Sequence, residues 1–370
     1  MGKKSKLEYC MNDVFITYGS LITPLGNSVT ENYQGLLADK TGVKAHYECG
    51  FNKETWQLAK IEEIKENRYS TLLKKGCEEL ISTISKDIIQ SPKTLVLVST
   101  TKGDIDVFPK DTFSSTIQIL NQELGLFNSP IIVSNACISG VIAINTAADY
   151  IRFEKFETVI VIGIDVVSDF VVYGFQSLFA LSDAPVKPYD KDRKGIALGE
   201  GVAIVILSNK KVNSQFHAKY LNGSSSNDAN HISGPSRTGE GLVRSIQKTL
   251  ERSNVKVEQI DFVSAHGTGT IYNDEMESIA FERTALQNTP LNSFKGYFGH
   301  TLGAAGVIEV IVCLLSMENS ILFKSYGFSE VGTSKEMKLL TKNLKTEVNT
   351  VLKTASGFGG GNASLLLIKE

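Results

Sequence analysis

Short apolar runs alternate along this chain with longer segments in which hydrophobic residues recur every three or four positions. The runs predict buried strands, and the longer segments predict amphipathic helices. The predicted strands are 14–16, 94–99, 131–133, 158–164, 202–207, 218–222, 260–265, 291–294, about 349–354 and about 364–369. The predicted helices are 29–38, about 54–87, 112–124, one with apolar residues at 141, 142, 144 and 148, 239–252, 274–286 and 303–318. Such alternation indicates an α/β layer structure.

The β-branched run at 158–164 is typical of a parallel strand that is covered on both faces. The stretch 173–199 has no regular period and is rich in Gly, Pro, Ser and Asp, which predicts irregular structure. A chain of 370 residues is too long for one ordinary core. Both 1–208 and 209–370 run strand, helix, strand, reactive residue in a loop, helix, strand, so we predict two duplicated halves without obvious sequence identity.

Composition and charge exclude several function classes. A net charge of −2 gives no reason to expect a nucleic-acid partner. No apolar run approaches the ~18 residues of a membrane span, and no apolar segment follows the basic N-terminus as in a signal peptide. The five cysteines are an odd number without a CxxC pair, which argues against a disulfide framework or a zinc site and favours the reducing cytoplasm.

The candidate nucleophile is Cys137, which lies between the strand 131–133 and the helix that follows. A thiol at a helix N-terminus faces unpaired N–H groups and the positive end of the helix dipole, so we expect a lowered pKa and a reactive thiolate. The same strand–turn–helix elbow presents serine nucleophiles in other folds. The alternative is a small buried residue that packs the strand against the helix.

Two histidines stand in similar positions. His266 follows the predicted strand 260–265 in the sequence HGTGT, where glycines let a ligand approach the backbone and threonine hydroxyls could bond a polar chain. His300 precedes a helix that begins with small residues, which permit close packing under a site. Lys295 and Glu309 flank His300 and could support its imidazole. The alternatives are a hydrogen-bonded turn, a tightly packed internal helix and exposed charges.

One thiol and two imidazoles in glycine-flanked loops suit one kind of chemistry. The sulfur can carry an acyl group while neutral imidazole N–H groups hold a developing enolate or oxyanion, as carbon–carbon bond formation on thioesters requires. The other histidines, His46, His217 and His231, lack this context. No Walker or HExxH pattern is present, and GFGGGN near the C-terminus lies between late strands rather than at a strand–helix junction, so it does not predict a nucleotide site.

With these residues in view, the chain resembles the β-ketoacyl-acyl carrier protein synthases of the Cys-His-His elongating type, within the thiolase superfamily. The resemblance covers nearly the whole chain. It rests on five motifs in the family's order: NACISG, KPYDKDRKGIALGEG, AHGTGTIYNDEMES, KGYFGHTLGAAGVIE and GFGGGNASLLL. It implies the thiolase fold, in which two pseudo-repeated α/β halves form five αβαβα layers. The Cys137 half would be 1–208 and the half with both histidines 209–370.

The resemblance also implies a role for individual residues. Cys137 would accept the acyl group, and His266 and His300 would promote decarboxylation of a malonyl-carrier substrate and stabilise the enolate. Lys295 would support the His266 loop and the charge balance. The remaining implied positions are Asp274 and Glu309 as polar partners of Lys295, the backbone N–H groups of Cys137 and Phe358 as the oxyanion hole, and Thr268 and Thr270 as contacts for the phosphopantetheine arm.

The implied reaction is a decarboxylative Claisen condensation that gives a 3-oxoacyl-acyl carrier protein in fatty acid, polyketide or polyene synthesis. The implied partners are acyl carrier protein and a second subunit, as a homodimer or a heterodimer, and no metal or organic cofactor is needed. Arg193 and nearby lysines are candidates for the carrier contact. The chain departs from the family in a shortened 101–130 region, in Ser356 where an aromatic is common, and in Ile138 after the cysteine.

Two other functions remain open at this stage. A non-catalytic subunit like a chain length factor would dock on an active synthase, but such subunits have usually lost the cysteine that is present here. A thiolase-like enzyme acting on coenzyme A thioesters would need a second catalytic cysteine near the C-terminus. Cys313 lies within an apolar helical pattern and is a poor candidate for that role.

Overall fold

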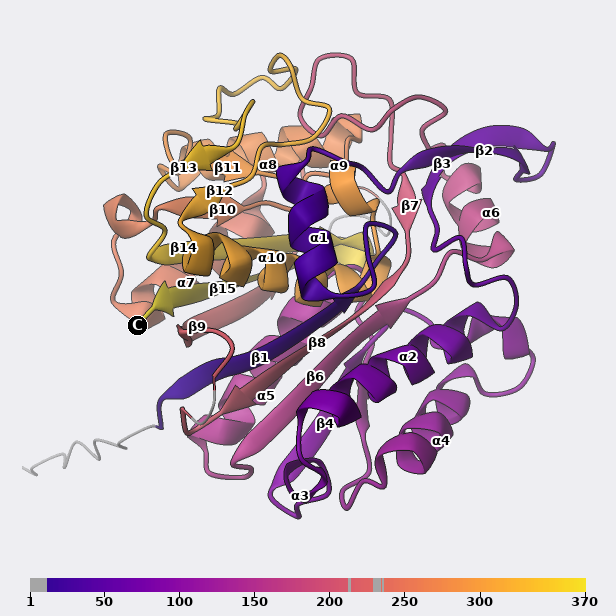
Figure 1. Cartoon of the computed structure of the whole chain (residues 1–370). Coiled ribbons are helices and arrows are strands. Elements are labelled where there is room, and N and C mark those ends of the chain that lie inside the picture. The colour runs from indigo at the N-terminus through magenta and orange to yellow at the C-terminus, as the bar shows by residue number, and fades with distance from the viewer. Residues whose placement is uncertain (1–11, 212–213, 229–233, 235) are drawn as a thin grey trace, which may run out of the picture.

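A ten-stranded sheet runs through the computed structural model, which describes residues 12–211, 214–228, 234 and 236–370 (Figure 1). Five strands of its first half lie in the order β1, β8, β6, β4, β5. β1 and β8 pair antiparallel, as do β8 and β6, whereas β6, β4 and β5 are parallel. Their bounds are β1 (Val14–Ile22), β4 (Thr94–Ser99), β5 (Ile131–Val133), β6 (Thr158–Asp165) and β8 (Gly201–Ser208).

The second half repeats this pairing in the order β9, β15, β14, β10, β11. The first two pairs are antiparallel and the last two are parallel. The strands are β9 (Ala218–Asn227), β10 (Phe262–Ser264), β11 (Leu291–Asn292), β14 (Thr350–Gly357) and β15 (Gly361–Lys369). The halves join where 14–16 of β1 pair with 218–220 of β9. The prediction of two pseudo-repeated halves is confirmed, while the division at residue 208 stays a prediction.

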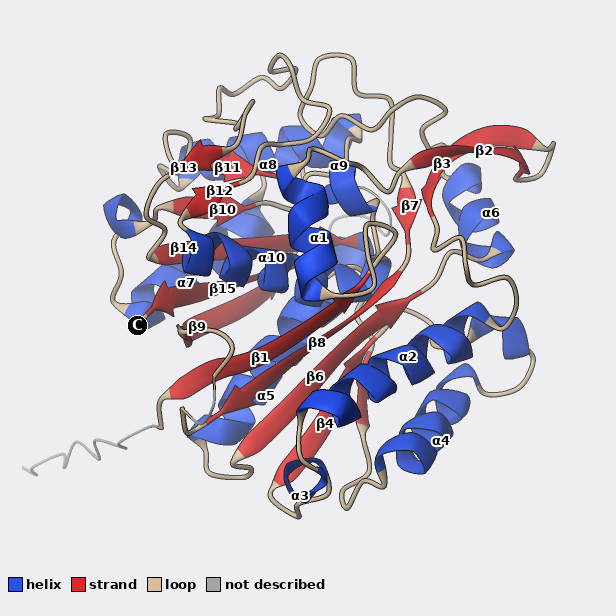
Figure 2. Ribbon diagram, in the orientation of Figure 1, coloured by secondary structure: helices blue, strands red, loops and turns tan. Residues whose placement is uncertain are grey.

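Helices cover both sides of each half-sheet, which gives the five predicted layers (Figure 2). α5 and α10 lie in the middle, in one core with residues of both half-sheets. α2 and α4 cover the outer face of the first half-sheet, and α7 and α8 that of the second. The bounds are α2 (Arg68–Thr83), α4 (Thr112–Leu124), α5 (Ser139–Arg152), α7 (Glu240–Ser253), α8 (Ile271–Arg283) and α10 (Ala305–Asn319).

β6 shows why the central strands are apolar on both faces. Val159 and Val161 belong to the core around the central helices, whereas Ile160 and Ile162 belong to the core under α2 and α4. β6 is parallel to β4 but antiparallel to β8, so the predicted parallel pairing is correct on one side only. The alternation of two valines and two isoleucines therefore fills two separate cores from a single strand.

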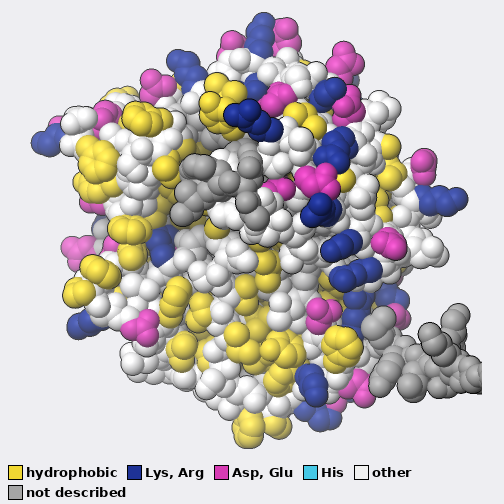
Figure 3. All heavy atoms as spheres, turned by 180° about the vertical axis from the view of Figure 1, so that it is seen from behind, with side chains coloured by type: hydrophobic (Ala, Val, Ile, Leu, Met, Phe, Trp, Pro, Cys, Tyr) yellow, Lys and Arg dark blue, Asp and Glu magenta, His cyan; other side chains and the backbone are white. Residues whose placement is uncertain are grey.

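The remaining elements are short and mostly peripheral. They are α1 (Val29–Leu37), β2 (Lys44–Cys49), β3 (Glu54–Ala59), α3 (Lys86–Ile89), α6 (Asp169–Ser177), β7 (Leu198–Gly199), α9 (Lys295–Phe298), β12 (Ile321–Leu322), β13 (Leu344–Lys345) and four 3-10 turns at 105–107, 257–259, 302–304 and 358–360. β2 and β3 form a hairpin that projects beside α6 in Figure 1. Figure 3, the opposite side of the molecule, shows hydrophobic side chains gathered over its lower half and a row of Lys and Arg along one flank.

Several predicted bounds were wrong where distant pairing decides the structure. The predicted helix over 54–87 begins only at Arg68, because 54–59 pair as β3 with β2 and β7. The supposedly irregular stretch 173–199 contains the end of α6, and β1 continues to Ile22 along β8. β14 and β15 extend until only 358–360 separate them, and β9 runs five residues beyond its predicted end. Cross-strand partners set these lengths, and partners far along the chain leave no local pattern.

α10 is apolar on all sides because it lies at the centre of the molecule. It belongs to Leu302–Asn319, the one stretch among the described residues with a helix long and apolar enough to cross a membrane, and 89% of it is buried inside the fold. Small residues let it approach α5: a Cβ on Gly306 would lie 2.6 Å from Val141 N, and one on Gly140 2.9 Å from Gly306 Cα. The predicted close packing of this helix is therefore confirmed.

Replacing Gly306 with alanine tests this close crossing. The new Cβ would collide with the backbone of α5, so we expect Gly306→Ala to lower the free energy of unfolding by about 1–3 kcal/mol, measured by urea denaturation. Gly174 in α6 is the matched control, because a Cβ there meets nothing within 4 Å. Gly174→Ala is expected to be neutral or to stabilise by up to about 1 kcal/mol. Equal stability of Gly306→Ala and the wild type would contradict this account of the helix crossing.

Candidate active site

Cys137 occupies the predicted elbow between β5 and α5. Ala136, the residue before it, has a φ of 44°, a conformation that is strained for a residue with a Cβ. The Ser139 hydroxyl holds this turn, because it accepts from Asn135 N at 2.7 Å and donates to Ala136 O at 2.6 Å. The turn places the thiol one residue before Ile138, the N-cap residue of α5, as the strand–turn–helix pattern predicts.

His266 projects from the carboxyl end of β10, and a buried carboxylate fixes its backbone. The N–H groups of His266 and Gly267 donate to Glu277 at 2.8 and 2.7 Å, and the Tyr189 hydroxyl donates to the same carboxylate at 2.9 Å. Sequence reasoning missed Glu277. The available signal was its spacing from Asp274, since acids three residues apart on a helix lie on one face.

Asp274 does not pair with Lys295, so that expectation was wrong. Its carboxylate instead accepts from the N–H groups of Thr268 at 2.9 Å and Tyr189 at 2.7 Å. The cation beside Asp274 is Arg193, whose Nε lies 3.8 Å from Oδ2 of the carboxylate. Because α8 passes beneath the loop that follows β10, Asp274 stabilises the loop rather than the lysine.

His300 follows α9 through Gly299, whose φ of 66° favours glycine. The ring atom Nδ1 of His300 accepts a hydrogen bond from Leu302 N at 3.2 Å. In a neutral imidazole this places the proton on Nε2. Nε2 is buried and has no hydrogen-bond partner among the described residues, so it is a donor directed into the site.

Lys295 and Glu309 form the expected pair, with Nζ and Oε1 2.8 Å apart, and both side chains are buried. The sequence did not indicate that Glu309 has a second cation. Lys353 Nζ lies 2.5 Å from Glu309 Oε2 and is also buried. The missed signal is a lysine within the apolar strand predicted at 349–354, since an unpaired charge there would be very costly.

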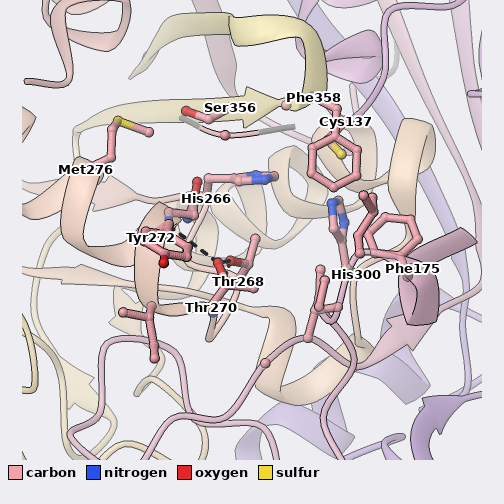
Figure 4. Close-up of a pocket in the computed structure, with 18 of the residues that line it drawn as sticks. Cys137, Phe175, His266, Thr268, Thr270, Tyr272, Met276, His300, Ser356 and Phe358 are labelled. Atoms are coloured by element: carbon pink, nitrogen blue, oxygen red, sulfur yellow. Dashed lines mark hydrogen bonds between the residues drawn. The ribbon is translucent and has the colours of Figure 1, made fainter. Parts of the chain in front are cut away.

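These elements bring the three predicted catalytic side chains together (Figure 4). The Cys137 sulfur and one ring nitrogen each of His266 and His300 all lie within 4.8 Å of one another. The two imidazole rings have their centroids 5.1 Å apart and are nearly perpendicular, at 84°. All three line one pocket of about 520 Å³. Residues 137, 266 and 300 thus converge at one point.

Polar and aromatic groups line the rest of the pocket. Thr268 and Thr270 have their hydroxyl oxygens 2.8 Å apart, and both side chains lie along the wall (Figure 4). Phe358, in the turn between β14 and β15, stacks on Phe175 of α6 with centroids 5.5 Å apart. Ser356 also lines the pocket where the family often has an aromatic, so Phe175 supplies the ring beside Phe358.

Two backbone N–H groups act on the sulfur. Those of Cys137 and Phe358 both favour the thiolate and lower its pKa. The turn comes close because Gly357 lacks a side chain: a Cβ there would lie 3.1 Å from Cys137 N. Two N–H groups beside one nucleophile have the arrangement of an oxyanion hole, the role expected for these residues.

Burial overturns the expected thiol acidity and makes the imidazoles neutral. It raises the pKa of the Cys137 thiol to about 12, and Lys295 and the N–H groups of Phe358 and Cys137 lower this pKa by less. The prediction of a lowered pKa was therefore wrong, because desolvation of the thiolate outweighs the helix N-terminus. Burial, followed by the positive charges of Lys295 and Lys353, holds the pKa values of His266 and His300 well below the ordinary range.

The other candidates fall outside the pocket. Arg193 is buried and donates to Asp190 O and Gly332 O, so it is not an exposed carrier contact, whereas its neighbour Lys194 lines the pocket. Cys313 is buried within α10. His46 and His217 also lie away from the pocket, and His231 is outside the described residues.

Sequence models of two domains match this chain. The beta-ketoacyl synthase N-terminal domain matches residues 112–213, and the beta-ketoacyl synthase C-terminal domain matches 217–329, together more than half of the chain. A putative mitochondrial 3-oxoacyl-[acyl-carrier-protein] synthase of Schizosaccharomyces pombe is 26% identical over 97% of this chain and 99% of its own. A 3-oxoacyl-[acyl-carrier-protein] synthase 2 of Rhizobium meliloti is 34% identical over 64% of this chain and 59% of its own.

Solved structures show the same fold. A ketosynthase in complex with its chain length factor from Xenorhabdus doucetiae superposes with a TM-score of 0.84, at 25% identity over all of both chains. The ishigamide ketosynthase/chain length factor superposes with a TM-score of 0.86, at 24% identity over 98% of this chain and all of that one. Structural similarity therefore extends over essentially the entire length, including both halves of the sheet.

The alkylation of Cys137 by iodoacetamide tests the raised thiol pKa. Only the thiolate reacts, so we expect little labelling at pH 7 and a rise of about tenfold per pH unit towards alkaline pH. Peptide mass spectrometry separates Cys137 from Cys313, whose thiol is buried away from the pocket and is expected to stay unlabelled. Labelling of Cys137 that reaches a plateau below pH 8 would instead support a lowered pKa.

Proposed function

From the premise that this chain belongs to the β-ketoacyl synthase family, we propose that its pocket performs the decarboxylative condensation of an acyl thioester with malonyl-acyl carrier protein. The product would be a 3-oxoacyl-acyl carrier protein. The observation that carries the proposal is the meeting of Cys137, His266 and His300 at one point of the pocket. One sulfur can hold the growing acyl group while two imidazoles serve the second substrate.

The first half-reaction transfers the acyl group to Cys137. The thiol is protonated at neutral pH, so its proton must leave as the sulfur attacks the thioester carbonyl. His266 is the base for this step, because His300 presents the protonated Nε2. The N–H groups of Cys137 and Phe358 stabilise the oxyanion. The tetrahedral intermediate then expels the carrier thiolate, which takes the proton from His266.

The second half-reaction forms the carbon–carbon bond. The bond to the malonyl carboxylate breaks, carbon dioxide leaves, and its electron pair forms an enolate. The enolate oxygen accepts a hydrogen bond from His300 Nε2–H, and a second one from His266 when that ring carries its proton on the nitrogen that faces the pocket. Neutral imidazoles suit this role, because they donate hydrogen bonds without transferring a full proton. The enolate carbon attacks the acyl carbonyl, and the tetrahedral intermediate releases the 3-oxoacyl product and the Cys137 thiolate, which takes a proton from solvent to restore the thiol.

The proposed substrates arrive on the phosphopantetheine arm of an acyl carrier protein. The hydroxyls of Thr268 and Thr270 along the pocket wall support this, because they can bond the amides of such an arm. The proposed chemistry needs no metal or organic cofactor, since the sulfur, the imidazoles and the backbone N–H groups supply every step. The choice between fatty acid and specialised polyketide or polyene synthesis rests on the acyl donors that the enzyme accepts.

We also propose a dimer, as a homodimer or with a second synthase-like subunit. Two of the structural relatives contain a ketosynthase with its chain length factor. β5 supports an interface because it is the last strand at one end of the sheet, and Ile131 is 41% exposed there. Cytoplasmic location is likewise proposed, and the four described cysteines, which are all free, fit a reducing compartment.

An acylation experiment distinguishes the proposed enzyme from a non-catalytic partner subunit. We expect an adduct of one acyl group on Cys137 after incubation with an acyl-acyl carrier protein, detected by intact and peptide mass spectrometry. Cys137→Ala is expected to abolish the adduct, whereas the control Cys313→Ala keeps it. The absence of an adduct with every thioester donor would contradict the proposed enzyme and favour the subunit like a chain length factor.

The two half-reactions can be separated by mutation. Cys137→Gln removes the nucleophile and resembles an acylated cysteine in shape, so we expect no condensation but continued decarboxylation of malonyl-acyl carrier protein. His300→Ala removes one enolate donor and is expected to lower decarboxylation on the order of a hundredfold or more. Release of carbon dioxide from labelled malonyl-carrier measures both. Full condensation by His300→Ala would show that the role assigned to this histidine is wrong.

A further inference from the structure

Lys353 is a fully buried lysine in the middle of β14, and its ammonium group has four oxygen neighbours. It donates to the backbone carbonyls of Thr354 at 2.7 Å, Ser264 at 3.2 Å and Ala265 at 3.4 Å. The fourth neighbour is Glu309 Oε2. Ser264 and Ala265 are the last two residues before His266, so the ammonium group binds the end of the segment that carries a catalytic ring.

Glu309 is shared between two cations. Lys295 contacts Oε1 and Lys353 contacts Oε2, so each carboxylate oxygen has its own ammonium group. Burial alone would raise the pKa of this carboxyl, but Lys295 and Lys353 together hold it below the ordinary value. The three side chains carry a net charge of +1 in a region that excludes water. Such a charge is costly, and the backbone carbonyls around Lys353 offset part of the cost.

We propose that Lys353 is a positioning residue of the condensing site, which fixes the end of β10 against α10 through Glu309 and the Ser264 and Ala265 carbonyls. This inference rests on the proposed function. His266 follows the end of β10 by two residues, and α10 begins five residues after His300. A single ammonium group therefore connects the supports of both imidazoles, and it comes from a third element, β14.

Lys353 also contributes to the electrostatics of the pocket. Several titratable groups surround the two imidazoles. They are Cys137, Asp165 (whose charge acts on the Cys137 thiol), Asp274 and Glu277 of α8, Lys295, Glu309 and Lys353. After burial, the positive charges of Lys295 and Lys353 lower the pKa of both rings. Glu309 is already neutralised by Lys295. The excess positive charge thus comes from Lys353, and it favours both neutral imidazoles and an enolate beside them.

Lys353→Met removes the charge and keeps a side chain of similar length. We expect kcat for condensation to fall on the order of tenfold to a hundredfold, because a small displacement of either donor is sufficient for this loss. KM for malonyl-acyl carrier protein is expected to change by less than about threefold, since the arm contacts Thr268 and Thr270. Without the positive charge, the imidazole pKa values should rise. The fall in the condensation rate at low pH, the acid limb of the pH profile, then moves to higher pH.

Lys369→Met is the matched control. Lys369 lies on the neighbouring strand β15 and donates to a carbonyl of α10, Met317 O, at 2.7 Å, near the end of this helix that lies away from His300. This variant is expected to keep the wild-type kcat and pH profile. Lys353→Arg keeps the charge and is expected to restore the acid limb. An unchanged kcat and acid limb in Lys353→Met would overturn the proposal.

Two further measurements keep the outcome decisive. Nuclear magnetic resonance of histidine-labelled enzyme follows the pKa values of the two buried rings directly. This measurement tests the role of Lys353 even if the wild-type enzyme condenses none of the substrates offered. A wild-type enzyme without condensing activity would contradict the proposed function, not the role of Lys353. If Lys353→Met does not fold, Lys353→Gln keeps a donor for the carbonyls without the charge and is expected to show the same shift. Failure of both to fold would show a structural role alone and overturn the proposal.

Discussion

The active pocket depends on how closely α5 and α10 can approach, and two glycines set that distance. Gly140 and Gly306 meet where any side chain would strike the backbone of the other helix. Cys137 precedes α5, and His300 precedes α10. The crossing therefore brings the sulfur and one imidazole together from the two halves of the chain, and the end of β10 supplies the second imidazole. The site belongs to neither half alone.

Desolvation acts on every ionisable group at this junction. It keeps the Cys137 thiol protonated and both imidazoles neutral, so the resting pocket contains hydrogen-bond donors rather than charged nucleophile and acid. The full charges lie behind the residues that line the pocket, where Glu309 bridges Lys295 and Lys353. The arrangement separates the groups that react from the ions that create the electrostatic field around them.

The sequence predicted the elements whose signals are local. Residues 94–99 and 112–124 match β4 and α4, and the three reactive residues were found because each lies in a loop near a glycine. Glu277 and Lys353 were missed because their roles depend on partners in other elements: Lys353 lies 89 residues from Ser264. The thiol pKa was wrong for a related reason, since helix position is visible in the sequence and burial is not.

The hydrogen bonds between β1 and β9 make the two halves one sheet. A chain cut near residue 208 would leave each fragment with an open strand edge and with one of the two central helices uncovered. Neither fragment would retain a closed core, so the duplicated halves are no longer separable units. An ancestral half would have required a second copy of itself to cover the same surfaces, and joining the copies in one chain makes their association independent of protein concentration.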